Sequence, residues 1–194
     1  MSAQAPRLIL ASASPRRLAL LAQIGVAPEA VWAAELDETP KPSEPPRALA
    51  LRLARAKAEA AALAHPGKAC LGADTVVACG RRILPKAETE AQARACLTLL
   101  SGRAHQVLTG MALAQAGAPT RARISLSRVA FRQLSAGDIE AYIGCGEWQG
   151  KAGGYAIQGR AGAFVRQLNG SYSGVVGLGL FEAAALLRAA GLAP

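Results

Sequence analysis

Apolar and polar positions follow a helical spacing in several parts of this chain. Residues 46–64 combine Ala and Leu with Arg and Lys so that an apolar face alternates with a basic face, which predicts a long amphipathic helix. Shorter helices are predicted by apolar periodicity and by start or stop signals, such as Ser135 three residues before Asp138 and the terminal Gly102. These shorter helices are expected at residues 15–24, 89–102, 135–144 and 180–191.

Other segments have the β-branched, apolar character of strands. Two strands around a turn at Gly80 are predicted within residues 68–84, and a hairpin is predicted from the β-like segments on either side of the sequence QAGAPT. The remaining strands are expected at residues 7–11 and 30–34, and the hairpin strands at residues 106–116 and 121–132. Helices and strands alternate in one half while hairpins dominate the other, so we predict an α/β fold with a mixed sheet. The expected organisation is a single domain over residues 1–194.

Composition excludes several classes of protein. Hydrophobic residues make up 52% of the chain and charged residues 18%, which excludes general disorder. No apolar run approaches the ~20 residues of a membrane span, and the short run LILA is too brief for a secretory signal, so a cytoplasmic location without membrane association is expected. Four scattered cysteines without a CxxC pair give neither a zinc signature nor a disulfide framework.

The net charge of +9 points to an anionic partner. Arginine supplies most of the excess, but it is spread along the chain without a basic block, and aromatic residues are not interleaved with it. Dispersed charge suits a small phosphorylated ligand as well as a nucleic acid, so composition leaves both open.

The segment ASASPRRLALLAQIG (residues 11–25) contains an electrostatic mismatch. Ser14 has the character of an N-cap and Pro15 of a first helical residue, which puts Arg16 and Arg17 in the positively polarised first turn. Backbone N–H groups, the hydroxyls of Ser12 and Ser14 and two guanidinium groups would then surround one point, a site suited to phosphate. The alternative is that both arginines face solvent, where the mismatch costs only ~0.3–1 kcal/mol.

Acidic residues and two lone lysines add further candidates. Asp74 in the sequence GADT is expected at the end of an apolar strand, where the chain leaves the sheet and a carboxylate can hold a divalent cation or accept a proton from water. A turn-capping aspartate is the commoner role for such a residue. Glu38 belongs to the acidic cluster ELDE and would complete a Mg²⁺ site if it lay near Asp74. Lys57 and Lys86 are otherwise typical surface lysines.

The segment from residue 144 to 179 is too rich in glycine to form one regular element. Glycine lets backbone approach a ligand closely, and Tyr155 and Gln158 could present an aromatic face and an amide to a nucleotide base. An ordinary loop with a buried tyrosine is the alternative.

Taken together, the motifs resemble those of the Maf proteins in order and spacing, from about residue 8 to residue 187. The segments that carry the resemblance are LASASPRR, LDETP, RLARAKA, LGADTVV, LSGRAHQVLTG, GEWQGKAGGYAIQGRAGAFV and LNGSYSGVVGL. The resemblance implies the elongated mixed sheet with flanking helices of the inosine triphosphatase group, with two lobes around a central cleft, commonly as a homodimer. It also implies cleavage between the α and β phosphates of a nucleoside triphosphate, in the presence of Mg²⁺ or Mn²⁺.

The same resemblance implies roles for individual residues. Asp74 would be the catalytic general base and, with Glu38, a ligand of the metal. The substrate-binding residues would be Ser12, Arg16, Arg17, Lys57 and Lys86.

Three positions, Arg16, Thr75 and Gln158, resemble the branch of the family that prefers dTTP and UTP. A glutamine amide offers one donor and one acceptor, which complements O4 and N3–H of uracil and thymine. A small nucleotide is therefore the expected partner in place of a nucleic acid. Two alternatives stay open: a nucleotide-binding regulator of cell division and septum formation without significant turnover, and a broad house-cleaning hydrolase of non-standard nucleotides.

Overall fold

The computed structural model describes residues 7–192. The strands are β1 (Leu8–Ala11), β2 (Ala30–Val31), β3 (Ala69–Cys79), β4 (Arg82–Leu84), β5 (Lys86–Ala87), β6 (Ala104–Gln115), β7 (Ala118–Phe131), β8 (Lys151–Ala152) and β9 (Val165–Asn169). The helices are α1 (Pro15–Gln23), α2 (Pro46–Ala64), α3 (Glu90–Leu100), α4 (Ala136–Cys145), the 3-10 helix η1 (Arg160–Phe164), α5 (Tyr172–Val176) and α6 (Leu180–Arg188).

The main sheet is mixed, as the sequence predicted. Its strand order is β2-β1-β3-β6-β7-β9, with β4 paired to β3 outside this path. Strand β1 runs parallel to both β2 and β3, whereas β3, β6, β7 and β9 are joined by antiparallel pairings. A separate antiparallel ribbon is formed by β5 and β8.

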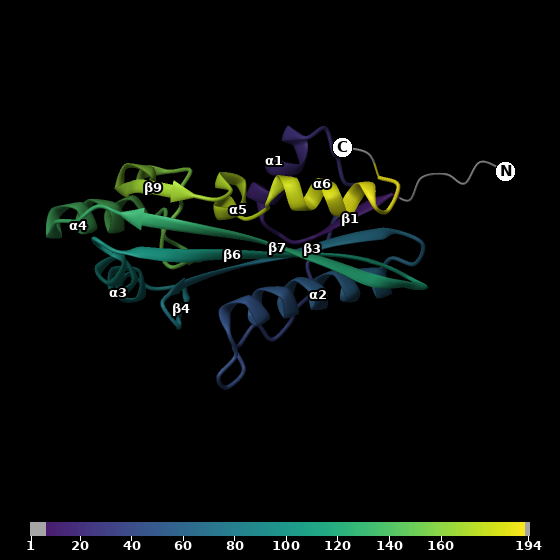
Figure 1. Ribbon diagram of the computed structural model, residues 1–194, viewed down its shortest axis with the longest axis horizontal. Coiled ribbons are helices and arrows are strands. Elements are labelled where there is room, and N and C mark those ends of the chain that lie inside the picture. Colours follow the sequence, from purple (N-terminus) through teal and green to yellow (C-terminus); the bar gives the residue numbers. More distant parts are fainter. Residues whose placement is uncertain (1–6, 193–194) are drawn as a thin grey trace.

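Helices cover both faces of the sheet in an elongated molecule (Figure 1). Helix α2 lies against one face of the long strands, and α1, α5 and α6 lie on the opposite side, while α3 and α4 cover one end (Figure 1). Side chains of β3 alternate between the two faces accordingly: Leu71 and Val77 enter the larger hydrophobic cluster, whereas Cys70 and Val76 pack in the clusters beneath α2. The predicted α/β architecture with flanking helices is therefore confirmed.

Helix α2 approaches the sheet unusually closely because both surfaces are built from small residues. A Cβ atom added to Gly72 in β3 would lie 2.4 Å from the carbonyl oxygen of Ala54 and 2.6 Å from the backbone nitrogen of Ala58. A Cβ atom added to Gly110 in β6 would lie 2.3 Å from the carbonyl oxygen of Ala50. The alanine face of α2 thus rests directly on two glycines, which fixes the height of the helix above the sheet.

Local signals predicted most element boundaries correctly. The helix predicted over residues 46–64 coincides with α2, and the predicted Ser135–Asp138 capping box is present at the start of α4. The strand expected over residues 30–34 is shorter, because only Ala30 and Val31 pair with β1. Among residues 7–192, no helix combines the length and the apolar character that crossing a membrane requires.

The expected position of Asp74 was wrong. This residue lies in the middle of β3, which continues to Cys79, and not where the chain leaves the sheet. The strand continues because β6 pairs with it from Cys70 to Ala78, and because β4 pairs with it again from Val77 onward. It is the neighbouring strand β1 that ends here, at the pairing of Ala11 with Gly72.

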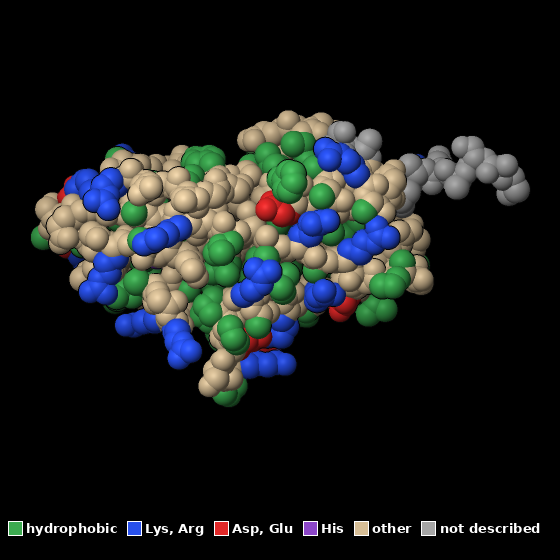
Figure 2. All heavy atoms as spheres, viewed as in Figure 1, with side chains coloured by type: hydrophobic (Ala, Val, Ile, Leu, Met, Phe, Trp, Pro, Cys, Tyr) green, Lys and Arg blue, Asp and Glu red, His purple; other side chains and the backbone are tan. Residues whose placement is uncertain are grey.

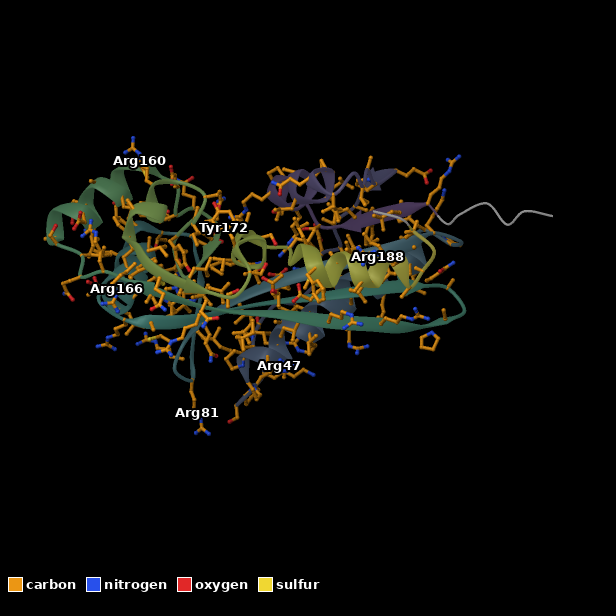
Figure 3. The ribbon with its side chains drawn as sticks, turned by 45° about the horizontal axis from the view of Figure 1, so that its top comes forward. Arg47, Arg81, Arg160, Arg166, Tyr172 and Arg188 are labelled. Carbon is orange, nitrogen blue, oxygen red and sulfur yellow. The ribbon has the colours of Figure 1, made fainter. Side chains whose placement is uncertain are left out.

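The positive charge is dispersed over the surface, as the sequence indicated. Lysine and arginine side chains are scattered over the face drawn in Figure 2, between apolar and uncharged side chains. Arg47, Arg81, Arg160 and Arg166 are exposed, and Figure 3 shows them well separated on the molecule.

Candidate active site

The candidate site occupies a gap between strands on one side of β3. Strand β1 pairs with β3 only as far as Gly72, and β4 begins to pair at Val77. In the part of the chain that the structure describes, the residues between them pair only with β6, so this side of Asp74 and Thr75 is open. Successive side chains of a strand point to opposite faces, and both of these residues line the same cavity.

This cavity has a volume of about 270 Å³. It lies beyond the carboxyl end of β1, where the chain turns into α1, which is the usual position of ligand sites at parallel strands. Polar and charged side chains contribute much of its lining: Ser12, Ser14, Arg16, Arg17, Glu38, Lys57, Asp74, Thr75, Lys86, Lys151 and Tyr155.

A chain of alternating charges crosses the cavity. Nζ of Lys57 on α2 lies 2.6 Å from Oδ1 of Asp74 and 2.5 Å from Oε1 of Glu38. The other carboxylate oxygen of Glu38 accepts a hydrogen bond from Nζ of Lys86. The close packing of α2 on Gly72 brings Lys57 within reach of a carboxylate in the middle of the sheet. The structure therefore joins four residues that are distant in the sequence.

Burial and hydrogen bonding act in opposite directions on Glu38. Burial disfavours the charged carboxylate, but hydrogen bonds from Lys57 and Lys86 outweigh it and lower the pKa of Glu38 to about 2. Glu38 is thus fully ionised at neutral pH. Asp74 is 2% exposed, and its second oxygen, Oδ2, takes part in none of the hydrogen bonds formed within residues 7–192. This oxygen is available to a ligand in the cavity.

Arg17 is held rigidly at the start of α1. Its Nε donates to the carbonyl of Gly177 at 2.9 Å, and its Nη1 donates to Oγ of Ser12 at 2.8 Å. Burial lowers the pKa of the Arg17 guanidinium, Asp74 opposes this effect and Arg16 adds to it. The guanidinium stays protonated, because the pKa of a free arginine lies above 12.

A series of hydrogen bonds through Thr75 and Thr109 also helps to hold Arg17 in place. Thr109 Oγ1 donates its only proton to the carbonyl of Gly174 at 2.7 Å, and it lies 2.9 Å from Oγ1 of Thr75. Thr75 must therefore donate to Thr109, so its oxygen is free to accept from Nη2 of Arg17 at 3.4 Å. The Thr75 hydroxyl therefore donates its proton to Thr109 and has none left for a ligand.

Arg16 is half-buried beside this group, and its guanidinium makes none of the side-chain hydrogen bonds or ion pairs found in the described part of the chain. Burial lowers the pKa of its guanidinium. The first turn of α1 contains no acidic residue, and its N-cap, Ser14, makes no side-chain capping bond. The positive end of α1 and two guanidinium groups thus face the cavity, and neither guanidinium forms an ion pair with a carboxylate of residues 7–192, an arrangement suited to a phosphate group.

Tyr155 closes another part of the cavity. Its hydroxyl lies 2.8 Å from Nε2 of His105, and its ring makes an edge-to-face contact with Phe131. Burial lowers the pKa of His105 to about 4, so this imidazole is neutral at pH 7. The tyrosine is therefore a rigid aromatic wall whose hydroxyl already has a partner.

The structure brings together most of the predicted site residues. The residues named from the sequence that line the cavity are Ser12, Ser14, Arg16, Arg17, Glu38, Lys57, Asp74, Thr75, Lys86 and Tyr155. Gln158 does not line it and is exposed to solvent, so its selection of a base stays a prediction. Lys151 lines the cavity but was given no ligand-binding role from the sequence, because nothing in its local pattern distinguishes it from a surface lysine.

Two carboxylates in this cavity have the chemistry that a hard divalent cation requires. Within residues 7–192, no three His, Cys, Asp or Glu side chains are arranged to hold a metal ion, so Asp74 and Glu38 are the carboxylate ligands available here. Mg²⁺ is commonly bound by one or two carboxylates together with substrate phosphates and water. The free Oδ2 of Asp74 and the adjacent Glu38 fit that pattern.

Comparison with known proteins gives close relatives over nearly the whole chain. The chain is 58% identical to the dTTP/UTP pyrophosphatase of Gluconobacter oxydans, over 94% of this chain and 86% of that protein. It is 54% identical to the dTTP/UTP pyrophosphatase of Caulobacter vibrioides, over 99% of this chain and 100% of that protein.

Likeness to solved structures is weaker. The Staphylococcus aureus Ham1 protein has a TM-score of 0.47 and 16% identity, with 64% of this chain and 71% of that chain covered. A nucleoside-triphosphatase / dITP/XTP pyrophosphatase from Mycobacterium abscessus has a TM-score of 0.43 and 19% identity, with 67% of this chain and 75% of that chain covered.

The family model described as Maf-like protein matches residues 7–190, which include every residue of the cavity described above. This match and the identities to the curated relatives agree with the resemblance that the sequence motifs indicated. The chain belongs to the Maf family.

Proposed function

We propose that this protein is a nucleoside triphosphate pyrophosphatase that hydrolyses dTTP and UTP to the monophosphate and pyrophosphate. The observation that carries the proposal is that one cavity holds both the cationic start of α1 and the open carboxylate oxygen of Asp74. The names of the relatives, which share more than half of their residues with this chain, support the same activity and the same pyrimidine substrates.

In this proposal the triphosphate tail lies against the start of α1. A nucleoside triphosphate carries about four negative charges, and cleavage increases the charge on the leaving pyrophosphate. Arg16, Arg17 and the positive end of the helix would stabilise that charge, and Ser12 would orient Arg17 through its hydroxyl. Because Arg17 is already held by three hydrogen bonds, it needs no reorganisation when the substrate binds.

Asp74 is the proposed general base. Lys57 holds the carboxylate through Oδ1, which leaves Oδ2, an oxygen with two lone pairs, to take a proton from water beside the cation that it would help to hold. The oxygen of that water forms a bond to the α-phosphorus, and the bond from this phosphorus to the bridging oxygen breaks, with its electron pair leaving on pyrophosphate. Lys57 and Lys86 would exchange part of their contact with Glu38 for phosphate oxygens.

The proposed cofactor is Mg²⁺ or Mn²⁺, held by Asp74 and Glu38 together with phosphate oxygens. A bound divalent cation lowers the pKa of water and neutralises phosphate charge. The role of the protein residues is to supply the two carboxylates and to keep their negative charge balanced by Lys57 and Lys86 until the substrate enters.

Substrate selection is proposed to depend on Arg16, Thr75 and Gln158. Arg16 and Thr75 lie in the cavity, and because the Thr75 proton is donated to Thr109, Thr75 would act on the substrate through the position of Arg17. Gln158 would contribute its amide to O4 and N3–H of the pyrimidine. We also propose that the protein acts as a homodimer, as the resemblance to its family implies, and in the cytoplasm, as expected from its composition.

The test is incubation with a panel of nucleoside triphosphates in the presence of Mg²⁺ or Mn²⁺, with products followed by phosphorus NMR. Formation of dTMP or UMP together with pyrophosphate supports the proposal. Diphosphate and inorganic phosphate would identify cleavage of a different bond, and tight binding without turnover would identify a nucleotide-binding regulator. Equal rates on modified and ordinary nucleotides of all bases would instead indicate a broad house-cleaning hydrolase.

A further inference from the structure

The side chains that line the cavity carry a net positive charge, and this excess can be assigned to particular residues. Five cationic side chains line the cavity together with the two carboxylates of Glu38 and Asp74. Both carboxylates are engaged by Lys57, and Glu38 also by Lys86. No ion pair within residues 7–192 reaches the other three cations, which are Arg16, Arg17 and Lys151. The net positive charge that meets an anionic ligand therefore lies on these three residues.

Lys151 is placed at the cavity by a rigid piece of backbone. It belongs to β8, where it pairs with Ala87 of β5, and its backbone nitrogen donates to the carbonyl of Trp148 at 3.1 Å. Gly153, at a φ of +69°, lies so close to β3 that an added Cβ would be 2.8 Å from Cγ1 of Val77. The ribbon is thus pressed against β3, and Lys151 is not a lysine on a free surface loop.

The surroundings of the Lys151 side chain are unfavourable for a cation without a ligand. The side chain is half-buried, and its only protein partner within residues 7–192 is the carbonyl of Gln149, 2.8 Å from Nζ. Burial lowers the pKa of Lys151, repulsion by Arg16 lowers it further, and Glu147 opposes the shift. Glu147 accepts a hydrogen bond from the backbone of Arg160 at 2.7 Å and forms no ion pair with Lys151.

Arg16 and Lys151 are like charges in a partly buried cavity, so their repulsion raises the free energy of the unliganded protein. An anion between them removes this repulsion and uses the donors of Lys151 that the protein leaves unused, since an ammonium group has three and Gln149 takes one. The same reasoning applies to Arg16, whose guanidinium has no hydrogen-bond partner within the described residues.

We propose that Lys151 is a further substrate-binding residue, which binds the triphosphate tail jointly with Arg16. This assignment rests on the proposed nucleotide substrate. It adds a second cation from the ribbon of β5 and β8, in addition to Lys86 of β5, to those supplied by α1 and α2.

Binding of inorganic tripolyphosphate, measured by isothermal titration calorimetry, tests Lys151 without requiring turnover. Lys151→Met keeps most of the aliphatic side chain and removes the charge, and we expect affinity to fall roughly tenfold to a hundredfold, as for the loss of a hydrogen bond between charged groups. Lys151→Arg should bind within a few-fold of the wild type. Lys68→Met is the matched control, because Lys68 pairs with Glu29 outside the cavity and its loss changes the net charge equally.

A double variant separates joint binding from a structural effect. If Lys151 and Arg16 bind the same tail, the loss of affinity in Lys151→Met combined with Arg16→Met should differ clearly from the product of the two single losses. Wild-type affinity in Lys151→Met, or equal loss in Lys151→Met and Lys151→Arg, would overturn the assignment. A wild-type protein that binds tripolyphosphate but cleaves no nucleotide would overturn the proposed function while the variants still decide the role of Lys151.

Discussion

Nζ of Lys57 lies 2.6 Å from Oδ1 of Asp74, and this buried ion pair joins helix α2 to the centre of strand β3. The pair forms because two surfaces of small residues, Gly72 with Gly110 and the alanines of α2, let the helix approach the sheet. It also forms where β1 has ended, so the carboxylate is held from one side and open on the other. The close packing of α2 on β3 therefore also positions the carboxylate that we propose to act as the general base.

Asp74→Asn should abolish most of the activity without unfolding the protein. The amide cannot accept a proton from water, and loss of a general base typically lowers the rate ~10²–10⁴-fold. The side chain keeps its size and can still accept a hydrogen bond from Lys57. The measurement is kcat for dTTP hydrolysis, with thermal unfolding to verify the fold. A turnover close to that of the wild type would exclude Asp74 as the base.

Lys57→Met should destabilise the protein, because it leaves the carboxylate of Asp74 buried without its partner. Breaking a buried ion pair by removing one member costs about 3–5 kcal/mol in the free energy of unfolding. Lys86→Met is the control, since Lys86 is exposed and loss of its ion pair should cost at most about 1 kcal/mol.

The free energy of unfolding is measured by urea titration for Lys57→Met, for Lys86→Met and for the double variant Lys57→Met with Asp74→Asn. The double variant should recover part of the loss, because the uncompensated charge is removed. Equal stability of the Lys57→Met and Lys86→Met proteins would contradict the importance of the buried pair.

Gly72→Ala should reduce both stability and activity. The new methyl group would meet the backbone of α2 at Ala54 and Ala58, so the helix must shift and carry Lys57 away from Asp74. Overpacking of this kind costs typically about 1–3 kcal/mol. Gly144→Ala in α4 is the control, since nothing lies within 4 Å of the added Cβ, and it should stabilise the protein by roughly 0.5–1 kcal/mol. Urea unfolding and dTTP hydrolysis measure the two effects, and an unchanged rate in a destabilised Gly72→Ala protein would show that the height of α2 does not control the site.

Acidification below pH 6.5 should destabilise the protein through His105. Its pKa is about 4 in the folded state, against 6.5 for an unperturbed histidine, so the unfolded state binds a proton that the folded state excludes. The contribution of His105 to stability is complete above pH 6.5 and is lost as the pH falls toward 4, by about 2 kcal/mol between pH 7 and pH 5.

The free energy of unfolding at these two pH values, from urea titration, measures this effect. His105→Gln should lower stability at both pH values and lose most of the difference between them. His65→Gln, which removes the other histidine of the chain, should keep the difference. A wild-type protein equally stable at pH 7 and pH 5 would rule out the effect.

Gln158→Glu should weaken the preference for dTTP over GTP. A carboxylate offers only acceptors, so it cannot complement both O4 and N3–H of a pyrimidine. The measurement is the ratio of kcat/KM for the two nucleotides, with Gln149→Glu as a control for the added negative charge. Because Gln158 is exposed and outside the cavity lining, an unchanged ratio would assign base selection to the cavity residues instead.

Elements set by local interactions were predictable from the sequence. The bounds of α2 and the capping boxes of α3 and α4 depend on residues within a few positions of one another, and apolar periodicity marks such elements directly. The cationic start of α1, which we propose to bind phosphate, was predictable for the same reason, since Ser14, Pro15 and the two arginines define the start of this helix by themselves.

Tertiary structure decided where the charged groups meet. The position of Asp74 within β3 depends on where β1 and β4 stop pairing with it, and no local pattern records the end of a neighbouring strand. The same holds for Lys57, which reaches Asp74 from a helix packed on Gly72, and for Lys151, which is brought to the cavity by pairing with Ala87. The sequence alone therefore determined the elements and the types of side chain that the site uses. The three-dimensional packing determined which charges neutralise one another and which stay available to a ligand, because electrostatic interactions depend on distance in space and not on separation along the chain.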